Sequence, residues 1–339
     1  MVKVNLCGLT VSEIFDLIGH SGFTINHAVA ISNAVYKKGF SDISKISKIP
    51  KKLKDELNAI AITGIFTPST SELSADKTIK YLYRTESGKE FEAVYIPEDK
   101  RNTVCVSTQS GCRMGCKFCA TGRYGFHGNL SAGEIVNQVI SIPHASKVTH
   151  VVFMGMGEPM DNLEHVLKAC RILSSEWGPA ISSRNITVST VGITPAIEEF
   201  LANSECNLTL SIHSPFTDER KRVVPAENIY PVHEIIRLLK NYPLKKKRRL
   251  TIAYVMIKGL NDTDLHLAEI KTLLKGSSIR INLLPYHMLP GNQNTASSAE
   301  RMHFFKHELV VSGISASIRK SRGIDISAAC GLLASGLNR

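Results

Sequence analysis

Six apolar segments alternate with helix-like segments in the middle of the chain, and this alternation limits the possible folds more than any other feature. The six are NTVCVST, HVVFMGMG, RNITVST, NLTLSIH, RLTIAYVMI and IRINLLPYH. Strands that are nearly continuous in Val, Ile and Leu are typical of a parallel sheet covered on both faces. Six units are too few for a closed eight-stranded barrel. We therefore expect an α/β fold with an open, partial (β/α)6 barrel over residues 101–290, a C-terminal extension over residues 291–339, and a functional site where the carboxyl ends of the strands meet.

The segments before the barrel predict a small helical domain and a hairpin. Over residues 1–75, SEIFDLIGHSG, TINHAVAISNAVYKKG and PKKLKDELNAIA predict helices, the second opening at Thr24 and the third with Pro50 as its first helical residue. Period-two stretches on either side of ESGK predict a β-hairpin around Gly88, in a linker of residues 76–100. Several lysines of the helical domain have little opposing charge, which fits either a solvated face or a surface that contacts RNA. They are Lys37, Lys38, Lys45, Lys48, Lys51, Lys52 and Lys54.

Composition and charge limit the classes of protein to which the chain can belong. The chain has 339 residues, 43% of them hydrophobic, which is enough to bury a substantial core. It has 41 Lys and Arg against 30 Asp and Glu, and the net charge of +11 favours a polyanionic partner, although an ordinary basic protein has the same balance. The sequence has no long uncharged apolar run, and its N-terminus lacks the order of a secretory signal. We therefore expect no membrane contact and a cytoplasmic location.

Eight cysteines point to metal binding or catalysis, because a reducing compartment keeps thiols out of structural disulfides. Cys112, Cys116 and Cys119 stand at C-x3-C-x2-C spacing in GCRMGCKFCATG. Three thiolates hold three irons of a 4Fe–4S cubane and leave the fourth iron open to another ligand. Zinc is the alternative, and it needs a fourth ligand, for which His127 is the nearby candidate. Three further cysteines have apolar neighbours and are expected to be ordinary core residues: Cys7, Cys170 and Cys206.

The cysteine spacing resembles that of radical S-adenosylmethionine (SAM) enzymes. In those enzymes SAM occupies the open site and is split by one electron to give a 5′-deoxyadenosyl radical. FMGMGEP, at the end of the second strand, resembles their GGE-like motif, so Gly157 and Glu158 are expected to bind SAM; glycines there let the backbone approach a ligand. Residues at or just beyond other strand ends are expected to contact SAM as well, although strand-end serines are otherwise usually turn formers and a loop histidine often has no such role. They are Ser189, Ser211, Ile212, His213 and His287.

Longer motifs narrow the resemblance to one family. They are YIPEDKRNTVCVSTQSGCRMGCKFCATG, FMGMGEPMDN, ITVSTVGITPAI, LSIHSP and RKSRGIDISAACG. In order and spacing they resemble the dual-specificity ribosomal RNA and transfer RNA adenine-C2 methyltransferases. The resemblance implies methylation of an adenine at C2 in the peptidyl-transferase region of 23S rRNA and in the tRNA anticodon loop. It also implies one 4Fe–4S cluster, two SAM per turnover, a flavodoxin- or ferredoxin-type electron donor, a monomer, and no DNA partner.

The same resemblance implies a reaction in two stages. One SAM methylates Cys330 in DISAACG, and a radical made from a second SAM takes a hydrogen atom from that S-methyl group. The resulting methylene radical adds to the adenine. Glu92 then removes the C2 proton, and Cys105 forms a transient disulfide with Cys330 that releases the methylated RNA. Without the resemblance, Cys330 would be expected in the core and Glu92 on the solvent-facing side of a strand.

Two positions depart from the family pattern, and rival functions stay open. His287 stands where many relatives have Asn, and Ser327 stands where Asp is commoner, a change expected only to adjust the loop around Cys330. One rival is another radical SAM enzyme, such as a peptide modifier or an adenine-C8 methyltransferase of the antibiotic-resistance branch. The other is a non-catalytic iron–sulfur or zinc protein that binds RNA. Residues 157–159 and 322–323 resemble the C2 branch more closely.

Overall fold

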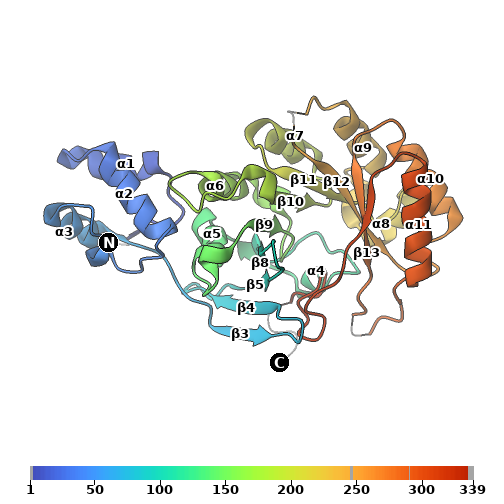
Figure 1. Ribbon diagram of the computed structural model, residues 1–339, viewed down its shortest axis with the longest axis horizontal. Helices are drawn as coiled ribbons and strands as arrows, with labels where there is room; N and C mark the ends of the chain where they lie inside the picture. The colour runs from blue at the N-terminus through green and yellow to red at the C-terminus, as the bar shows by residue number, and fades with distance from the viewer. Residues whose placement is uncertain (1–2, 245–246, 290, 335–339) are drawn as a thin grey trace.

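The computed structural model describes residues 3–244, 247–289 and 291–334, and it has a helical module at one end of a curved sheet (Figure 1). The elements of the module are β1 Val4–Asn5, α1 Val11–Ile18, α2 Ile25–Tyr36, α3 Lys51–Ile60 and β2 Ala61–Ile62. β1 and β2 pair in parallel and bring the two ends of the module together. The predicted helices are confirmed, with Thr24 as the N-cap of α2. Pro50, however, has an extended ψ of 153° and is the N-cap of α3, so its prediction as the first helical residue is wrong.

A ten-stranded sheet forms the body of the described structure, in the order β14-β13-β12-β11-β10-β9-β6-β5-β4-β3. Its parallel strands are β6 Thr103–Cys105, β9 His150–Phe153, β10 Ile186–Thr190, β11 Asn207–Ser211, β12 Leu250–Met256, β13 Arg280–Pro285 and β14 Ala316–Ile318. The six predicted strands are confirmed. β14 is an addition that places part of the predicted C-terminal extension in the sheet. Its three half-buried residues are too few to show a hydrophobic period in the sequence.

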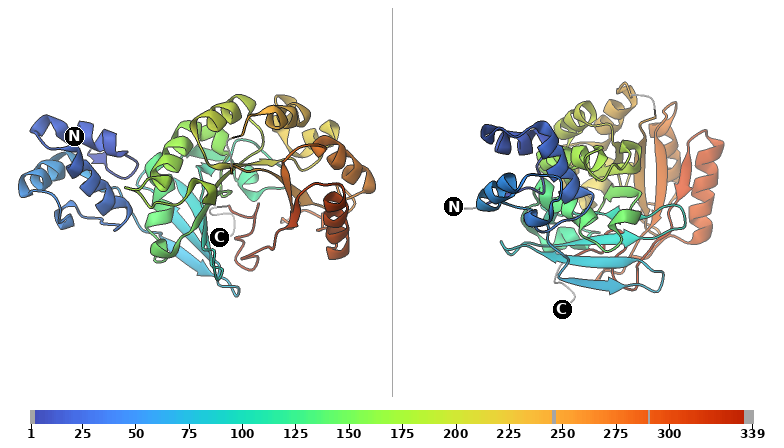
Figure 2. Two further views of the ribbon diagram at one scale, coloured as in Figure 1. Left: turned by 45° about the horizontal axis from the view of Figure 1, so that its top comes forward. Right: turned by 60° about the vertical axis from the view of Figure 1, so that its left-hand side comes forward.

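Helices connect the parallel strands and lie along the outer side of the curved sheet (Figures 1 and 2). They are α5 Ala132–Ile140, α6 Leu163–Ser174, α7 Thr194–Asn203, α9 Val232–Asn241, α10 Asp264–Leu274 and α11 Ala299–Val311. Figure 2 shows the C-terminal segment, residues 319–334, on the inner side of the curved sheet, so that both faces are covered as the sequence pattern predicts. Ser131 and Glu134 form the predicted capping box of α5. Across the described ranges, no helix combines the length and the apolar character needed to cross a membrane.

Antiparallel strands extend the sheet beyond β6. They are β3 Thr70–Leu73, β4 Ile79–Arg84 and β5 Glu90–Ile96, and β5 pairs with β6. Gly88, in the turn between β4 and β5, has a φ of 81°, which confirms the predicted hairpin around it. Tyr83 and Phe91 are fully buried, and their rings stack with centroids 5.4 Å apart. The predicted linker is therefore packed into the main sheet.

One hydrophobic core runs from the helical module through the sheet and its outer helices. Val151 and Phe153 of β9, Val188 of β10 and Leu210 of β11 are at most 1% exposed. Burial of this kind supplies most of the stability of such a fold. The scattered cysteines belong to the same core, as predicted: Cys7, Cys170 and Cys206.

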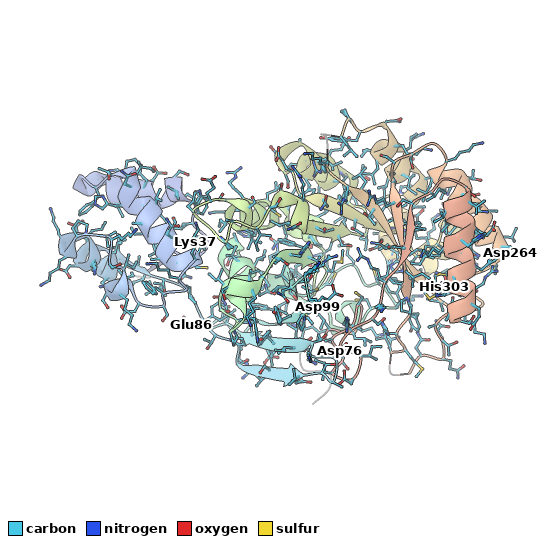
Figure 3. All side chains as sticks on the ribbon, in the orientation of Figure 1. Lys37, Asp76, Glu86, Asp99, Asp264 and His303 are labelled. Atoms are coloured by element: carbon cyan, nitrogen blue, oxygen red, sulfur yellow. The ribbon has the colours of Figure 1, made fainter. Side chains whose placement is uncertain are left out.

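The C-terminal segment, residues 319–334, returns across the turn between β3 and β4. Asp325 accepts a hydrogen bond from Ser74 Oγ at 2.6 Å. Asp76, labelled in Figure 3, accepts one from the Gly323 N–H at 3.0 Å. These bonds hold the end of the described chain beside strands that come far earlier in the sequence.

Candidate active site

A firmly held loop carries the three clustered cysteines. It runs between β7 Gln109–Gly111, which pairs with β8 Phe126–Asn129, and α4 Ala120–Tyr124, whose N-cap is Cys119. Gly111 has a φ of 76°, and a Cβ there would lie 1.7 Å from the Gly125 carbonyl oxygen, so only glycine fits. The Lys117 N–H donates a 3.1 Å hydrogen bond to the last residue of helix α8 Thr217–Val223. Neighbouring elements thus fix the path of the loop.

The thiols of this loop lie close enough to influence one another. Burial raises the pKa of Cys112 to about 12, while burial and then the charges of Cys119 and Cys112 raise the pKa of Cys116. A bound cationic metal centre relieves such repulsion, so three thiols on one loop fit a 4Fe–4S cluster. Among the described residues, no three His, Cys, Asp or Glu side chains are gathered closely enough to hold a metal ion. His127 is the candidate fourth zinc ligand, and its Nε2 lies 3.2 Å from the Tyr124 carbonyl oxygen.

The loop after β9 holds Gly157 and Glu158 against β7. Glu158 is buried, and its carboxylate accepts hydrogen bonds from the Val191 N–H at 2.9 Å and the Met160 N–H at 3.0 Å. Burial raises the pKa of its carboxyl to about 7 in spite of these bonds. Gly157 has a φ of 99°, and a Cβ there would lie 2.7 Å from the Gln109 backbone nitrogen. Packing against the chain itself therefore requires this glycine, and the contact of Gly157 with SAM stays a prediction.

The ends of β10 and β11 bring two predicted SAM residues together. Ser189 and Ser211 are half-buried, and their hydroxyl oxygens lie 3.4 Å apart. Ile212 is buried, and its N–H donates to the Ala253 carbonyl oxygen at 3.2 Å. The strand ends thus meet as the sequence predicts, and the contacts of these residues with SAM stay predictions.

His213 has the most unusual surroundings of the strand-end residues. Its φ of 58° is left-handed, a conformation that residues other than glycine seldom adopt. Its ring lies against that of Phe118 in the cysteine loop, with centroids 3.6 Å apart. Burial and then the charge of Arg220 lower its pKa to about 3, so the imidazole is neutral at pH 7. Its buried Nδ1 has no hydrogen-bond partner among the described residues, an orphaned atom that fits a polar group of bound SAM.

His287 lies on the loop after β13, where it contacts the C-terminal segment. Its Nε2 lies 2.9 Å from Ser321 Oγ on the C-terminal segment, and burial lowers its pKa. In the part of the chain that the structure describes, no hydrogen bond or ring contact joins it to Ser189, Ser211 or His213. Its contact with SAM therefore stays a prediction.

Strands β5 and β6 carry Glu92 and Cys105 on one face. Val94 lies opposite Cys105 in the register, and side chains two residues apart on a strand point the same way. Both residues are buried, and Glu92 is only 6% exposed, where an isolated strand glutamate would face solvent. Its Oε2 accepts a hydrogen bond from the Ala334 N–H at 2.9 Å, and Lys80 Nζ lies 3.8 Å from its Oε1. Burial raises the pKa of Glu92, and the charge of Lys80 opposes this shift.

The C-terminal segment brings Cys330 to the cysteine loop and to Cys105. The Ala120 N–H donates to the Gly331 carbonyl oxygen at 2.8 Å. Solvent reaches Cys330, but the surrounding protein still removes hydration from its thiol, which raises the pKa, and Cys119 adds to the shift. The pKa of Cys105 is raised by burial first and by Cys330 second. Both are free thiols, and the predicted pair lies within electrostatic range.

Arg220, which sequence reasoning missed, organises the same strand ends. It is 0% exposed and pairs with Glu227, which is also fully buried. Its guanidinium donates to the carbonyl oxygens of Ile212 at 2.9 Å and Ser211 at 3.2 Å, and to that of Val191. The pair therefore ties the loop after β10 to the end of β11. The helix that carries Arg220, TDERKRV, has the composition of an ordinary charged surface helix, and only its place in the connection that follows β11 could have singled it out.

Comparisons with known proteins agree with this arrangement. Residues 106–269 match the Radical SAM superfamily. A crystal structure of a radical SAM methyltransferase from Sphaerobacter thermophilus is similar with a TM-score of 0.90 and 37% identity, and the match covers 97% of this chain and 99% of that one. A Phocaeicola vulgatus protein described as probable dual-specificity RNA methyltransferase RlmN is 43% identical, over 98% of this chain and 95% of the relative. The dual-specificity RNA methyltransferase RlmN of Syntrophotalea carbinolica is 36% identical, over 98% and 90%.

The fold, the cysteine loop and the matches define a radical SAM methyltransferase. Within that class, the chain belongs to the family of the dual-specificity RNA methyltransferases RlmN. Membership implies SAM and a 4Fe–4S cluster as cofactors, and so favours the cluster over zinc.

Proposed function

We propose that this protein methylates C2 of an adenine in 23S ribosomal RNA and in transfer RNA, through a methyl group carried by Cys330. The 2.8 Å hydrogen bond from the Ala120 N–H to the Gly331 carbonyl oxygen, which sets Cys330 beside Cys119 of the cluster loop, is the observation that carries the proposal. The names of the relatives support RNA as the substrate, and a net charge of +11 suits a polyanion. The proposal includes two SAM per turnover, a flavodoxin- or ferredoxin-type electron donor, and a monomer that works in the cytoplasm.

The chemistry begins at Cys330. Adenine C2 is an electrophilic ring carbon, so a direct polar attack on SAM does not deliver a methyl group to it. When bound, SAM and the cluster supply the methyl group and a 5′-deoxyadenosyl radical. Cys330 Sγ loses its proton and accepts the methyl group. The S-methyl carbon then gives one hydrogen atom to the 5′-deoxyadenosyl radical, and the methylene carbon radical that remains adds to C2. The exposure of Cys330 suits a thiol that has to meet both SAM and RNA.

Glu92 and Cys105 complete the reaction. Burial raises the pKa of Glu92 towards the working pH, which favours a general base that takes the C2 proton. The adduct radical would also lose one electron, for which a bound cluster would be the acceptor. The Cys105 thiolate then attacks the sulfur of Cys330 and forms the disulfide, the bond from sulfur to the methylene carbon breaks, and that carbon takes up a proton to become the methyl group of the released base. Because burial raises the pKa of Cys105, release should quicken as the pH rises and the thiolate fraction grows.

Nucleoside mass analysis tests the reaction after anaerobic incubation of the protein with SAM, dithionite and RNA fragments. We expect 2-methyladenosine, and 8-methyladenosine or unmodified RNA would contradict the proposal. A non-catalytic RNA-binding protein would turn over no SAM.

Cysteine variants test the roles of the thiols. Cys330→Ala should keep the visible spectrum of the cluster but lose methylation, because the methyl carrier is gone. Cys105→Ala should accumulate a protein–RNA adduct on denaturing gels, and failure to trap one would exclude the release role. Cys206→Ala removes a comparably buried thiol of the core and is the matched control, with methylation expected at the normal rate.

A further inference from the structure

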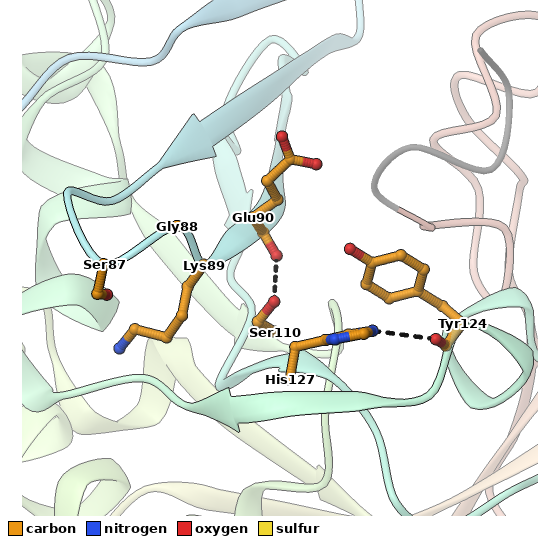
Figure 4. Close-up of a pocket in the computed structure, with 7 residues that line it drawn as sticks. All are labelled: Ser87, Gly88, Lys89, Glu90, Ser110, Tyr124 and His127. Atoms are coloured by element: carbon orange, nitrogen blue, oxygen red, sulfur yellow. Dashed lines mark hydrogen bonds between the residues drawn. The ribbon is translucent and has the colours of Figure 1, made fainter.

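A hollow at the β4–β5 hairpin, which carries Glu92, has no role in the reaction described above. It has a volume of about 310 Å³ and lies between the turn of the β4–β5 hairpin and the segment from α4 to β8 (Figure 4). Residues 87–90 form one side, and Ser110, Tyr124 and His127 form the other. Small-molecule sites begin at about 300 Å³, so the hollow admits one nucleobase.

Tyr124 links this hollow to Glu92. Burial raises the pKa of its hydroxyl, and the charges of Glu90 and then Glu92 raise it further, so both carboxylates act on the hydroxyl through space. Glu90 and Glu92 are two residues apart on β5, and their side chains share one face about 7 Å apart along the strand. Neighbouring nucleotides of an unstacked RNA strand are separated by a similar distance. A strand with its target base at Glu92 would thus place the next base at the hollow.

The rings of Tyr124 and His127 offer a surface for stacking. Their centroids lie 4.5 Å apart and their planes meet at 50°. His127 is exposed and Tyr124 is half-buried, so both rings are reachable from solvent. Bases of single-stranded RNA commonly stack on Tyr and His side chains.

The charges around the hollow favour a base over a phosphate group. Lys89 Nζ donates to Glu134 at 2.7 Å, and Glu90 forms an ion pair with Arg84. Both charged residues of the lining are therefore already paired, and a phosphate would lie beside the Glu90 carboxylate. Ser110 Oγ donates to the Glu90 carbonyl oxygen at 2.6 Å, which fixes the wall between β5 and β7 (Figure 4).

We propose that this hollow holds the nucleobase adjoining the target adenine of the RNA, stacked on Tyr124. The inference rests on the proposed function, because it requires RNA at Glu92. A neighbouring base held in the hollow anchors the strand while the target adenine is turned out of its stack towards Cys330. Enzymes that act on an extruded base commonly use contacts with the flanking nucleotides in this way.

The inference is tested by combining variants of Tyr124 with RNAs that lack a single base. Tyr124→Ala should raise the KM for RNA about tenfold, the size expected for one lost stack, whereas Tyr124→Phe keeps the ring and should stay within about twofold. Two further RNAs carry an abasic site on the 5′ or the 3′ side of the target. With the wild-type protein, one of these two RNAs should have a KM raised to a similar extent. Tyr124→Ala should not raise the KM for that RNA any further, because the stack is already absent. The inference is overturned if, for both abasic RNAs, the increase in KM caused by Tyr124→Ala simply multiplies the increase caused by the missing base.

Matched variants separate this inference from the proposed function. His127→Ala is measured with the same RNAs and keeps the test decisive if Tyr124→Ala does not fold. This variant should also raise the KM less for the abasic RNA than for intact RNA. His303→Ala removes another exposed histidine, on the outer helix α11 (Figure 3), and RNA binding should be unchanged. If the wild-type protein methylates no RNA, the proposed function fails. If it methylates RNA and the effects multiply, only the base-binding hollow is rejected.

Discussion

Replacing Arg220 by methionine should destabilise the folded protein by several kcal/mol. Arg220 is fully buried, donates to the carbonyl oxygens of Ile212 and Ser211 at 2.9 and 3.2 Å, and pairs with Glu227. Methionine fills much of the same space but leaves the Glu227 carboxylate buried, with the Val232 N–H at 3.0 Å as a remaining donor. Removal of one partner of a buried ion pair costs about 3–5 kcal/mol, and the lost bonds to carbonyl groups place Arg220→Met within that range.

Urea unfolding of the reduced apoprotein, followed by the fluorescence of Trp177, measures the loss. The double variant Arg220→Met/Glu227→Leu should be more stable than Arg220→Met by about 1–2 kcal/mol, because no charge is left unpaired. Lys52→Ala removes an exposed partner 3.9 Å from Glu56 and is the control, with an expected change within about 0.5 kcal/mol. A loss under about 1 kcal/mol for Arg220→Met, or a double variant less stable than the single one, would refute the reasoning.

Three further predictions concern residues around the same loops. Gly157→Ala should lower the free energy of unfolding by about 2 kcal/mol, because a Cβ would lie 2.7 Å from the Gln109 nitrogen; an unchanged urea midpoint would contradict this. Burial raises the pKa of Glu158 from 4.5 to about 7, so the folded form binds the extra proton and stability falls as pH rises through that window. Thermal melts across this range should show a flatter slope for Glu158→Gln, and an identical slope would exclude the shift. Ser327 has a φ of 52°, where Asp is tolerated better than Ser, so Ser327→Gly should stabilise the loop by about 0.5–1 kcal/mol. Limited proteolysis of the C-terminal segment checks this, and faster cleavage would count against it.

The features that the sequence predicts correctly depend on local signals. β9 to β13 repeat one pattern of short apolar runs, and the capping box of Ser131 and Glu134 needs only three residues of separation. The hairpin around Gly88 likewise follows from residues close together in the chain. Each of these elements would be favoured by its own residues even if its neighbours were unknown, which explains why sequence patterns suffice for them.

The features that sequence reasoning misses depend on distant partners. Arg220 stands in a run of charged residues that is typical of a surface helix, and its burial follows from Glu227 and from carbonyl groups on two strand ends. Gly157 is required by the approach of Gln109, nearly fifty residues earlier in the chain. Glu92 is buried because the C-terminal segment covers it, with the Ala334 N–H on its carboxylate. None of these contacts has a local signature.

The residues proposed to carry out the reaction lie outside the radical SAM core, which explains why that core alone would not perform it. The superfamily match, residues 106–269, contains the cluster cysteines and the strand ends around His213, whereas Glu92, Cys105 and Cys330 all lie outside it. These three residues come together because the hairpin and the C-terminal segment bind each other. Lys80 Nζ of β4 donates to the carbonyl oxygen of residue 326 at 2.7 Å, four residues before Cys330. The hairpin is therefore part of the site: it supplies the proposed base, and it holds the proposed methyl carrier within reach of the cluster loop.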